Sequence, residues 1–489
     1  MDLSCIDVPD QFFSEIPSQN HKNQLNNLEE MIHNSEYYQK LLNHSTPYKI
    51  SDRSLVSIVV TVIYELDQQI SYESVNGKLT RYVEIFEEEV KEFNYISRNR
   101  YLCKIEGLYN KSIPSICYSR GNLMKKNNQN NSFNQLICVI GFEDGVQLKI
   151  GERYHLIGIY QSSRFDEDNE LDIKLPTNQK FYILLWRTFG LTEYCLDSNG
   201  FTPQMNIVLN QYSKSISLDC NNFNVRNHIL TLFNSIIPEP MNLHLLLNLV
   251  SSIHTRQPMV LQKYSLGLIV DSFDPFINNL KEVLHFFNPF VEVIDACQTK
   301  SLLPQITSET IEYEEHSLQI GNDSIVIITA NKEINEQNKI LIEELLNQQM
   351  LQFNIYGQPI NIPINCSVIF VTKRDYNEDM IRLCDHNIII HQGITNISIN
   401  HLLHEWNQKE ILDAYRYFAY CRKLKCSITE DVQDIVTNSF VNARKINSNI
   451  DQMSLHKWLN VACILGSSYG KRKISHEIWN ETLQLLSLN

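Results

Sequence analysis

Long apolar runs, paired cysteines and an excess of positive charge are all missing from this sequence of 489 residues. No apolar run approaches the ~20 residues that a membrane-spanning helix needs. The first residues, Met1–Phe13, lack the basic and apolar pattern of a secretory signal. We therefore expect a protein that has no membrane partner.

The twelve cysteines are scattered along the chain and form no CxxC pair. This spacing excludes a zinc ribbon and gives no sign of a disulfide framework. Reduced thiols in the cytosol or nucleus are the simplest interpretation. The net charge of -14 argues against non-specific binding of nucleic acid by the whole surface, which needs a basic footprint. A local basic patch remains open.

Composition and patterning divide the chain into five parts. The hydrophobic content of 43% and charged content of 20% are typical of a globular protein, and the length predicts two to four domains. The predicted parts are a polar segment with one helix (1–50), a strand-rich domain (51–185), a connector (186–225), an α/β domain (226–405) and a helical tail (406–489).

The strand-rich part carries short β-branched runs separated by polar or Gly-containing segments, which is typical of a small β-barrel such as the OB-fold. The predicted strands are Ser54–Tyr64, Arg100–Lys104, Gln135–Gly141 and His155–Tyr160. The next part alternates continuous apolar strands with helices, which indicates a parallel sheet covered on both faces. Its predicted strands are Ser265–Val270, Ser324–Thr329, Cys366–Thr372 and Asn387–Ile390.

The stretch Leu266–Ile277 is the point around which the α/β part is organised. It predicts a buried strand, a short polar loop and then a helix, the arrangement in which a loop holds phosphates at a helix N-terminus. The loop consists of Asp271, Ser272, Phe273, Asp274, Pro275 and Phe276. It has no glycine and no lysine, and its two acids would repel phosphate. We expect the two phenylalanine rings to pack where a nucleotide would bind.

The tail from Trp406 predicts four amphipathic helices in a compact lid, with a capping box at Ser427–Glu430. It also holds more large aromatic residues than such a bundle needs. These are Trp406, Tyr415, Tyr420, Trp458 and Trp479. Because Trp and Tyr are favoured interface anchors, we expect some of them, with Trp458 and Trp479 as candidates, to contact a partner.

Several stretches in order resemble the minichromosome maintenance (MCM) proteins of the AAA+ class. They are Val146–Ile159 in the barrel, Ile236–Leu247 at the start of the core, Glu344–Leu351 and Ile362–Ile369 around a hairpin, and Ser427–Lys445 and Ser454–Trp479 in the lid. The resemblance implies an OB-like domain, an AAA+-like domain and a helical lid. It implies a Walker A loop at Asp271–Phe276 and a Walker B pair at Ile328 and Thr329, both degenerate.

Other functional positions of that family depart from its pattern in the same way. Sensor one falls near Lys373, sensor two falls on Asn460, and the arginine finger is at best displaced to Arg382. Of the zinc ligands only Cys103 and Cys117 lie in the right neighbourhood. The resemblance therefore implies no cofactor, no metal and no ATPase activity. Arg382 is retained as a candidate for reaching a partner's nucleotide, beside its simpler interpretation as a surface arginine.

The shared losses are similar to those of the MCM domain-containing group. That similarity implies a non-catalytic nuclear subunit that acts with MCM-like paralogues, and with DNA as a further candidate partner, in meiotic recombination, double-strand break repair and crossover formation. The alternative is a binding or regulatory subunit of the replicative MCM complex. A third hypothesis is an enzyme with a displaced ATP site that uses Lys373 or Lys263.

Smaller clusters leave further alternatives open. Basic residues that could touch DNA phosphates are Arg120, Lys125, Lys126, Lys471, Arg472 and Lys473, although solvated faces are the commoner role of such clusters. Cys103, Cys117 and Cys138, or His401 with His404, could hold a metal. No HExxH motif supports the histidine pair, and Cys138 fits an apolar core better.

Overall fold

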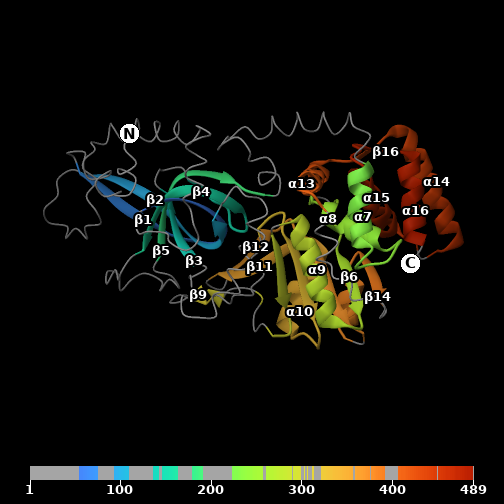
Figure 1. The fold of residues 1–489 in the computed structure, drawn as a ribbon, viewed down its shortest axis with the longest axis horizontal. Coiled ribbons are helices and arrows are strands. Elements are labelled where there is room, and N and C mark those ends of the chain that lie inside the picture. The colour runs from blue at the N-terminus through green and yellow to red at the C-terminus, as the bar shows by residue number, and fades with distance from the viewer. Residues whose placement is uncertain are drawn as a thin grey trace. The chain divides into compact units, whose positions relative to one another are not determined.

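The computed structural model describes residues 54–74, 93–108, 136–141, 146–162, 179–190 and 223–487, the last range with gaps at 257–259, 289, 299–301, 303–304, 307–310, 313–320, 356–357, 375, 391–405 and 449. The chain divides into two compact units. The first contains residues 1–204 together with Leu303–Tyr313 and Phe353–Ile362, and the second contains the remainder. Each unit is coloured by residue number in Figure 1.

The first unit is built on a closed barrel of five strands in the order β1-β2-β3-β5-β4 (Figure 1). The strands are β1 (Ser54–Ser74), β2 (Phe93–Leu108), β3 (Leu136–Gly141), β4 (Arg153–Ser162) and β5 (Gln179–Thr188). All neighbouring pairs are antiparallel except β3 and β5, which run parallel. The last strand, β5, was not predicted from the sequence.

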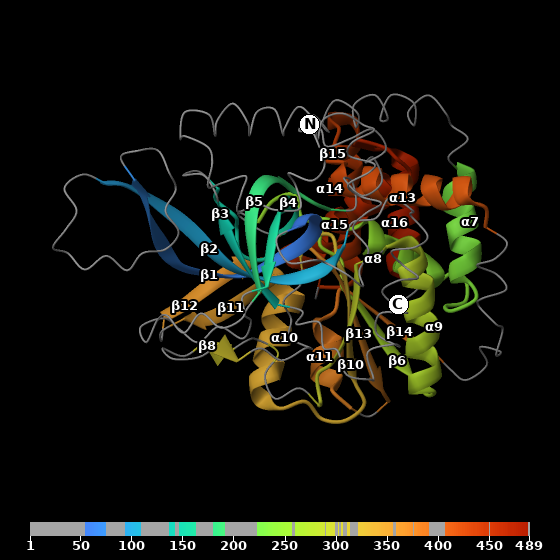
Figure 2. The same ribbon diagram turned by 60° about the vertical axis from the view of Figure 1, so that its left-hand side comes forward.

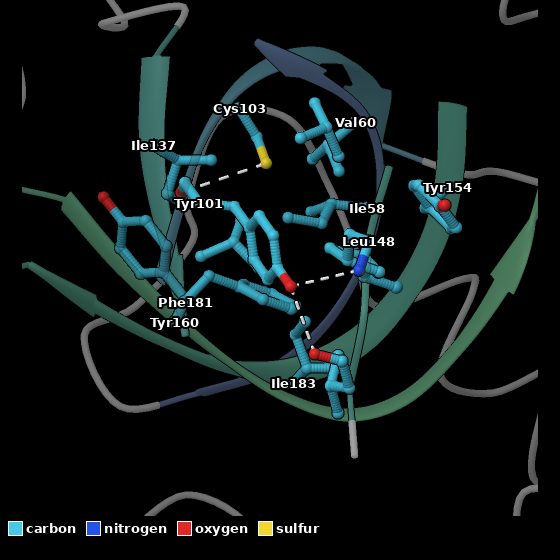
Figure 3. Close-up of a cluster of buried hydrophobic side chains, with 14 residues drawn as sticks. Ile58, Val60, Tyr101, Cys103, Ile137, Leu148, Tyr154, Tyr160, Phe181 and Ile183 are labelled. Carbon is cyan, nitrogen blue, oxygen red and sulfur yellow. Dashed lines mark hydrogen bonds between the residues drawn. The ribbon is translucent and has the colours of Figure 1, made fainter. Parts of the chain in front are cut away.

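Alternate residues of these strands fill the barrel interior with apolar side chains (Figure 3). The ring of Tyr101 lies in the middle, and its hydroxyl donates to the carbonyl of Val146 and accepts from the backbone N–H of Leu148. The Tyr154 hydroxyl accepts from the N–H of Lys149 and donates to the Glu152 carboxylate. Two buried tyrosines thus hold the segment before β4 in place.

A four-stranded sheet in the order β12-β11-β8-β9 forms in the middle of the chain. Its strands are β8 (Gln305–Ile306), β9 (Ile311–Glu312), β11 (Met350–Ile355) and β12 (Gln358–Pro363). Strands β11 and β12 fall in the region for which the sequence resemblance predicts a hairpin.

The second unit contains a five-stranded parallel sheet in the order β14-β6-β13-β10-β7 (Figures 1 and 2). The strands are β6 (Leu266–Val270), β7 (Val291–Asp295), β10 (Ile325–Ala330), β13 (Ser367–Lys373) and β14 (His386–Ile390). Three of them, β6, β10 and β13, are almost entirely buried, as expected of strands covered on both faces. The predicted strands agree with β6, β10, β13 and β14 to within one residue, whereas β7 was not predicted.

Three helices follow strands of this sheet: α9 (Phe273–Phe287) after β6, α10 (Glu336–Gln348) after β10 and α11 (Glu378–Leu383) after β13. Helix α8 (Asn242–Val250) precedes β6. The first strand, β6, lies between β14 and β13, the last two strands in the sequence. The next strand in the sequence, β7, lies at the far edge of the sheet. In open α/β sheets a reversal of this kind marks the crevice at the carboxyl ends of the strands as the usual ligand site.

Four C-terminal helices complete the second unit and pack against α8 and the preceding helix α7 (Phe223–Phe233). They are α13 (Gln408–Lys423), α14 (Glu430–Ile446), α15 (Gln452–Ser468) and α16 (His476–Ser487). Ser427 does not begin a helix as predicted, because Ser427–Ile428 is the short strand β15, paired with β16 (Lys473–Ile474), and Thr429 caps α14 without a side-chain hydrogen bond. The capping boxes lie instead at Asn407 and Asp451.

Candidate functional site

The carboxyl edge of the parallel sheet, where the five strands end, is the position at which the sequence predicts a degenerate phosphate loop. Strand β6 ends at Val270 and helix α9 begins at Phe273, so only Asp271 and Ser272 connect them. A phosphate cradle needs several consecutive backbone N–H groups turned toward the anion. A two-residue connection cannot supply them.

The charge at the start of α9 also disfavours an anion. A helix N-terminus attracts negative charge, and Asp274 in the first turn already supplies it. Asp271 is exposed just before the N-cap residue Ser272, which makes no capping hydrogen bond with its side chain. A phosphate placed here would meet two carboxylates in the first turn and its approach.

Phe273 and Phe276 both turn inward from the first turn of α9, with 8% and 7% of their surface exposed. The ammonium of Lys373, at the end of β13, lies 5.7 Å from the centroid of the Phe273 ring. Asp274 and Pro275, between the two rings, face solvent. The predicted packing of the rings is therefore present in the structure, and Lys373 contacts a ring at the position where the displaced-site hypothesis asks it to contact phosphate.

The two Walker B positions lie inside β10 and offer no oxygen to the edge. Ile328 is fully buried, and Thr329 is 5% exposed. The Thr329 hydroxyl donates to the carbonyl of Ile294 on the neighbouring strand. On β7, the Asp295 carboxylate accepts from the backbone N–H groups of Cys297 and Gln298. The polar groups at this end of β10 and β7 therefore bind backbone.

Lys263, the other lysine of the displaced-site hypothesis, lies on the wrong side of the sheet. It precedes β6 and therefore sits at the amino edge, where the strands begin. Its ammonium lies 2.9 Å from the Asp385 carboxylate and donates to the Leu346 carbonyl. The same Asp385 oxygen accepts from the N–H and hydroxyl of Ser265. Lys263 is a buried structural residue, so its proposed role in an ATP site is wrong.

A second buried ion pair joins the C-terminal helices to this amino edge. Arg422, near the end of α13, is 3% exposed. Its Nε lies 3.2 Å from the Asp323 carboxylate just before β10. Its Nη1 donates to the Leu249 carbonyl and to the Ser367 hydroxyl. One guanidinium thus connects α13, α8 and two strands.

Asn460, the predicted sensor-two position, makes a further connection to the amino edge. Its side-chain oxygen accepts from the Gln262 N–H, and its amide donates to the Lys263 carbonyl. Both bonds go to the strand-like segment that leads into β6. The side chain is buried at 7% exposure, so it positions helix α15 and does not face the carboxyl edge.

Two buried histidines stack beside these groups. The rings of His244 on α8 and His386 on β14 have centroids 3.4 Å apart, and His244 Nδ1 lies 2.6 Å from the Tyr264 hydroxyl. Burial, with a smaller contribution from His386, lowers the pKa of His244 to about 3. Burial, with a smaller contribution from Lys457, lowers the pKa of His386 to about 4. Both rings are neutral at physiological pH.

The candidate partner-contact residues divide sharply by exposure. Arg382, on α11, has 77% of its side chain exposed and forms an ion pair with Glu378 one turn earlier. Trp458 is half-buried and packs edge-on against Phe440 at 6.3 Å. Trp479 is fully buried, and its indole N–H donates to the Ser439 hydroxyl. The expectation that Trp479 contacts a partner is therefore wrong.

The other aromatic residues of the tail are core residues for the same reason. Trp406, Tyr415 and Tyr420 are 7%, 2% and 6% exposed. Trp406 stacks on His228 at 4.1 Å and meets the edges of Phe286 and Phe287. The aromatic residues looked too many for a core only because the prediction considered the helical bundle by itself. Trp406 fills the contact between this part of the chain and helices α7 and α9.

The predicted metal and nucleic-acid residues have different placements. Cys103 and Cys138 lie in the barrel core, and burial raises the pKa of the Cys103 thiol well above its usual value. In the described ranges no three ligating side chains gather into a possible metal site. Lys471, Arg472 and Lys473 are exposed. Residues Cys117, Arg120, Lys125, Lys126, His401 and His404, and the helix predicted near Leu25–Leu42, lie outside the described residues.

The second unit thus has a parallel α/β sheet with two buried phenylalanine rings at its carboxyl edge beside β6, and a helical bundle bonded to its amino edge. A family model described as "Mini-chromosome maintenance replisome factor" matches residues 198–488, more than half of the chain. The chain belongs to this family. It is also 24% identical over 257 residues to the "Mini-chromosome maintenance complex-binding protein" of Arabidopsis thaliana. That match covers 49% of this chain and 42% of the relative.

These comparisons correct the sequence-based assignment to the MCM domain-containing group. The family is one of replisome factors, and the similar plant protein is named for binding the MCM complex. The predicted roles in meiosis, recombination and crossover, and the pseudo-ATPase label, came with that assignment and are withdrawn with it. A parallel sheet followed by a helical bundle hosts many functions, so segment order alone could not separate the two groups. In the described parts, no helix has the length and apolarity to cross a bilayer.

Proposed function

We propose that this chain is a nuclear, non-enzymatic protein that binds subunits of the MCM complex and regulates their assembly or release. The observation that carries this proposal is the family match, which spans the whole parallel sheet and all four C-terminal helices. The name of the similar plant protein indicates the partner. The replicative complex, rather than a recombination-specific one, is the partner that the word replisome favours.

The carboxyl edge supports a binding role over catalysis. Nucleotide hydrolysis requires a positioned lysine, a magnesium-binding acid and an oriented water. At this edge the connection after β6 has two residues, Phe273 is buried in the first turn of α9, and Thr329 is bonded to backbone.

The amino edge supports a rigid adaptor. Arg422 and Asn460 bind the C-terminal helices to the strands through buried polar bonds. A hinged closure of the helices over the sheet would have to break these buried bonds, which disfavours such a motion. A fixed bundle presents one constant surface to a partner, which suits protein recognition.

We also propose that the barrel is OB-like and the parallel sheet AAA+-like in topology. The barrel has five strands, is closed and contains one parallel pair, which supports the first. The position of the β6–α9 connection at a reversal of strand order supports the second. A shared topology with MCM subunits would give this chain surfaces of the kind those subunits use with one another.

Co-expression of the full chain with each MCM subunit from the same organism tests the proposal. We expect a stable one-to-one complex with at least one subunit in size-exclusion chromatography with light scattering. A matched preparation with recombination-specific MCM-like paralogues is the comparison. Failure to bind any replicative subunit, or selective binding of the recombination paralogues, would overturn the proposal.

A further inference from the structure

The turn that joins α14 to α15 carries the most exposed apolar residues of the described second unit. Ile446 ends α14 with 90% of its surface exposed, and Met453 in the first turn of α15 is 58% exposed. Val441, just over one helical turn before Ile446, is 43% exposed. We call residues 440–458 the hairpin tip.

Scattered exposed apolar residues are normal on a protein surface, but Ile446 and Met453 lie on the two sides of one short turn. The N–H of Ile450 donates to the carbonyl of Asn447, which closes the turn and brings the helix ends together. Beneath it, Phe440 of α14 meets the edge of the half-buried Trp458 of α15. The exposed residues therefore stand on a packed aromatic base.

The charge of the hairpin tip is opposite to that of the chain. Arg444, Lys445 and Lys457 are exposed, and Asp451 is the one carboxylate in the stretch. That carboxylate is engaged in capping α15, where it accepts from the N–H and hydroxyl of Ser454. These bonds hold the pKa of Asp451 below its usual value. Three exposed cations thus lie within a few residues of Ile446 and Met453 on a protein with a net charge of -14.

We propose that the hairpin tip is the surface through which this chain docks onto an MCM subunit, with Ile446 and Met453 entering an apolar pocket that carboxylates border. This inference rests on the proposed function and names its contact surface. An apolar centre with a charged border is the usual anatomy of a protein interface. Opposite charge on the partner would guide association and fix orientation.

Two other occupants fit the surface less well. A nucleic acid would use the three cations but would leave the apolar centre without a partner, because phosphate contacts are electrostatic. A second copy docking tip to tip would bring basic groups against basic groups. We therefore propose an MCM subunit with an acidic border around its pocket as the partner of this surface.

The experiment uses the full chain and the MCM subunit that the co-expression experiment identifies. Ile446→Ser is compared with Ile340→Ser, which changes another exposed isoleucine, at 57% exposure on α10. Arg444→Glu combined with Lys445→Glu is compared with Lys471→Glu combined with Arg472→Glu, another exposed basic pair. Binding is measured by titration calorimetry at two salt concentrations, and thermal melting confirms that each variant folds.

We expect Ile446→Ser to weaken binding at least about tenfold, as an interface anchor does, and Ile340→Ser to change it less than about twofold. The charge reversal at Arg444 and Lys445 should weaken binding, and most strongly at low salt. The charge reversal at Lys471 and Arg472 should leave binding unchanged at both salt concentrations. Hydrogen exchange of residues 440–458 should slow in the complex.

Each contrary result has a distinct meaning. If wild type binds no subunit, the proposed function fails and this inference fails with it. If wild type binds and the tip variants bind equally well, only the docking surface is wrong. Loss of duplex DNA binding, or of dimerisation seen by light scattering, in the tip variants alone with subunit binding intact would assign the surface to those occupants and overturn the inference.

Discussion

The two edges of the parallel sheet use polar residues in opposite ways. At the amino edge, Lys263, Asp385, Asp323 and Arg422 form two buried ion pairs that hold helices to strands. At the carboxyl edge beside β6, the charged residues Asp271, Asp274 and Lys373 are exposed, and the packing comes from Phe273 and Phe276. In α/β proteins ligands bind at the carboxyl edge, so here the edge suited to a ligand has been closed with apolar side chains.

The two edges should therefore differ in how strongly substitutions of their charged residues lower the stability of the fold. Buried charge pairs tolerate the loss of one partner poorly, because the remaining charge stays in a low-dielectric interior. Exposed charges contribute little and can be replaced at small cost. If the function required nucleotide-driven motion, the arrangement would be expected to be the reverse, with the catalytic edge polar and the attachment of the helices loose.

The largest effect is expected at the carboxyl edge, from replacing Phe273 and Phe276 together with alanine. Each buried ring costs about 3–5 kcal/mol on truncation, so we expect the pair to lower the free energy of unfolding by roughly 6 kcal/mol. Urea denaturation at neutral pH measures the change. The matched control, leucine at both positions, should lose less than half as much because it keeps most of the volume.

An unchanged denaturation midpoint for the double alanine variant would break the comparison, since it would mean that the rings do not replace a ligand in stabilising this edge.

The next effect is expected at the amino edge, from Arg422→Met. Removal of the guanidinium takes away the ion pair of Asp323 and one of the hydrogen bonds of the Ser367 hydroxyl. We expect a loss of about 3–5 kcal/mol in the free energy of unfolding. Arg382→Met, at an exposed ion pair on α11, is the control and should cost less than about 1 kcal/mol.

A double variant, Arg422→Met with Asp323→Asn, sharpens the test because it removes the uncompensated charge. It should recover part of the loss. Equal destabilisation by the single and double variants would show that packing by the arginine side chain, not its charge, holds α13 in place.

The stacked histidines predict a pH dependence of stability. Because the folded-state pKa values of His244 and His386, about 3 and about 4, lie below the ordinary histidine pKa of about 6.5, the unfolded chain binds protons that the folded rings do not. Stability is therefore complete above about pH 6.5 and is lost as pH falls toward 4. Each ring contributes about 1.4 kcal/mol per pH unit in that window.

Between neutral pH and about pH 5.5 we expect roughly 2–3 kcal/mol of destabilisation from the two rings together. His386→Phe keeps a stacked ring and removes one titrating group, so its stability should fall about half as steeply. Urea denaturation across this pH range measures both slopes. Parallel slopes for wild type and variant would show that other groups dominate the pH dependence.

Most elements of the second unit could be predicted from the sequence because their apolar patterns are long and regular. Strands β6, β10 and β13 come from such patterns, and their predicted ends differ from the observed ones by at most one residue. The predicted end of α9 at Phe287 is confirmed, but the helix begins at Phe273, so Phe273–Phe276 of the predicted loop form its first turn. Strand β7 reads Val-Glu-Val-Ile-Asp, a short pattern with two acids that gives no clear strand signal. The start of α14 was missed because Ser427 pairs with β16, and pairing across 46 residues leaves no local trace.

The candidate site could be predicted only in part, and for a physical reason. The residue types of Asp271–Phe276 show that the stretch lacks the glycines and the lysine of a phosphate loop. They also indicate that the two phenylalanine rings pack there instead. The roles of Lys263, Asn460 and Trp479 depend on partners far along the chain, such as Asp385, Gln262 and Ser439. The sequence alone shows a lysine or a tryptophan but not whether tertiary contacts have already engaged it.

The smallest effects are expected from Lys373 and from added nucleotide. Lys373 is exposed and touches the Phe273 ring, and an exposed contact of this kind contributes about 0.5–1 kcal/mol. We expect Lys373→Ala to lower the free energy of unfolding by no more than that.

A site that bound magnesium–ATP with micromolar affinity would stabilise the folded chain by about 4 kcal/mol when the free ligand concentration is about a thousand times the Kd. We expect no measurable shift in melting temperature for wild type or for Lys373→Ala, with an active ATPase as the positive control for the assay. A clear upward shift in wild type that Lys373→Ala abolishes would mean that the ring contact opens to admit phosphate, and the contrast between the two edges would then hold only for the unliganded protein.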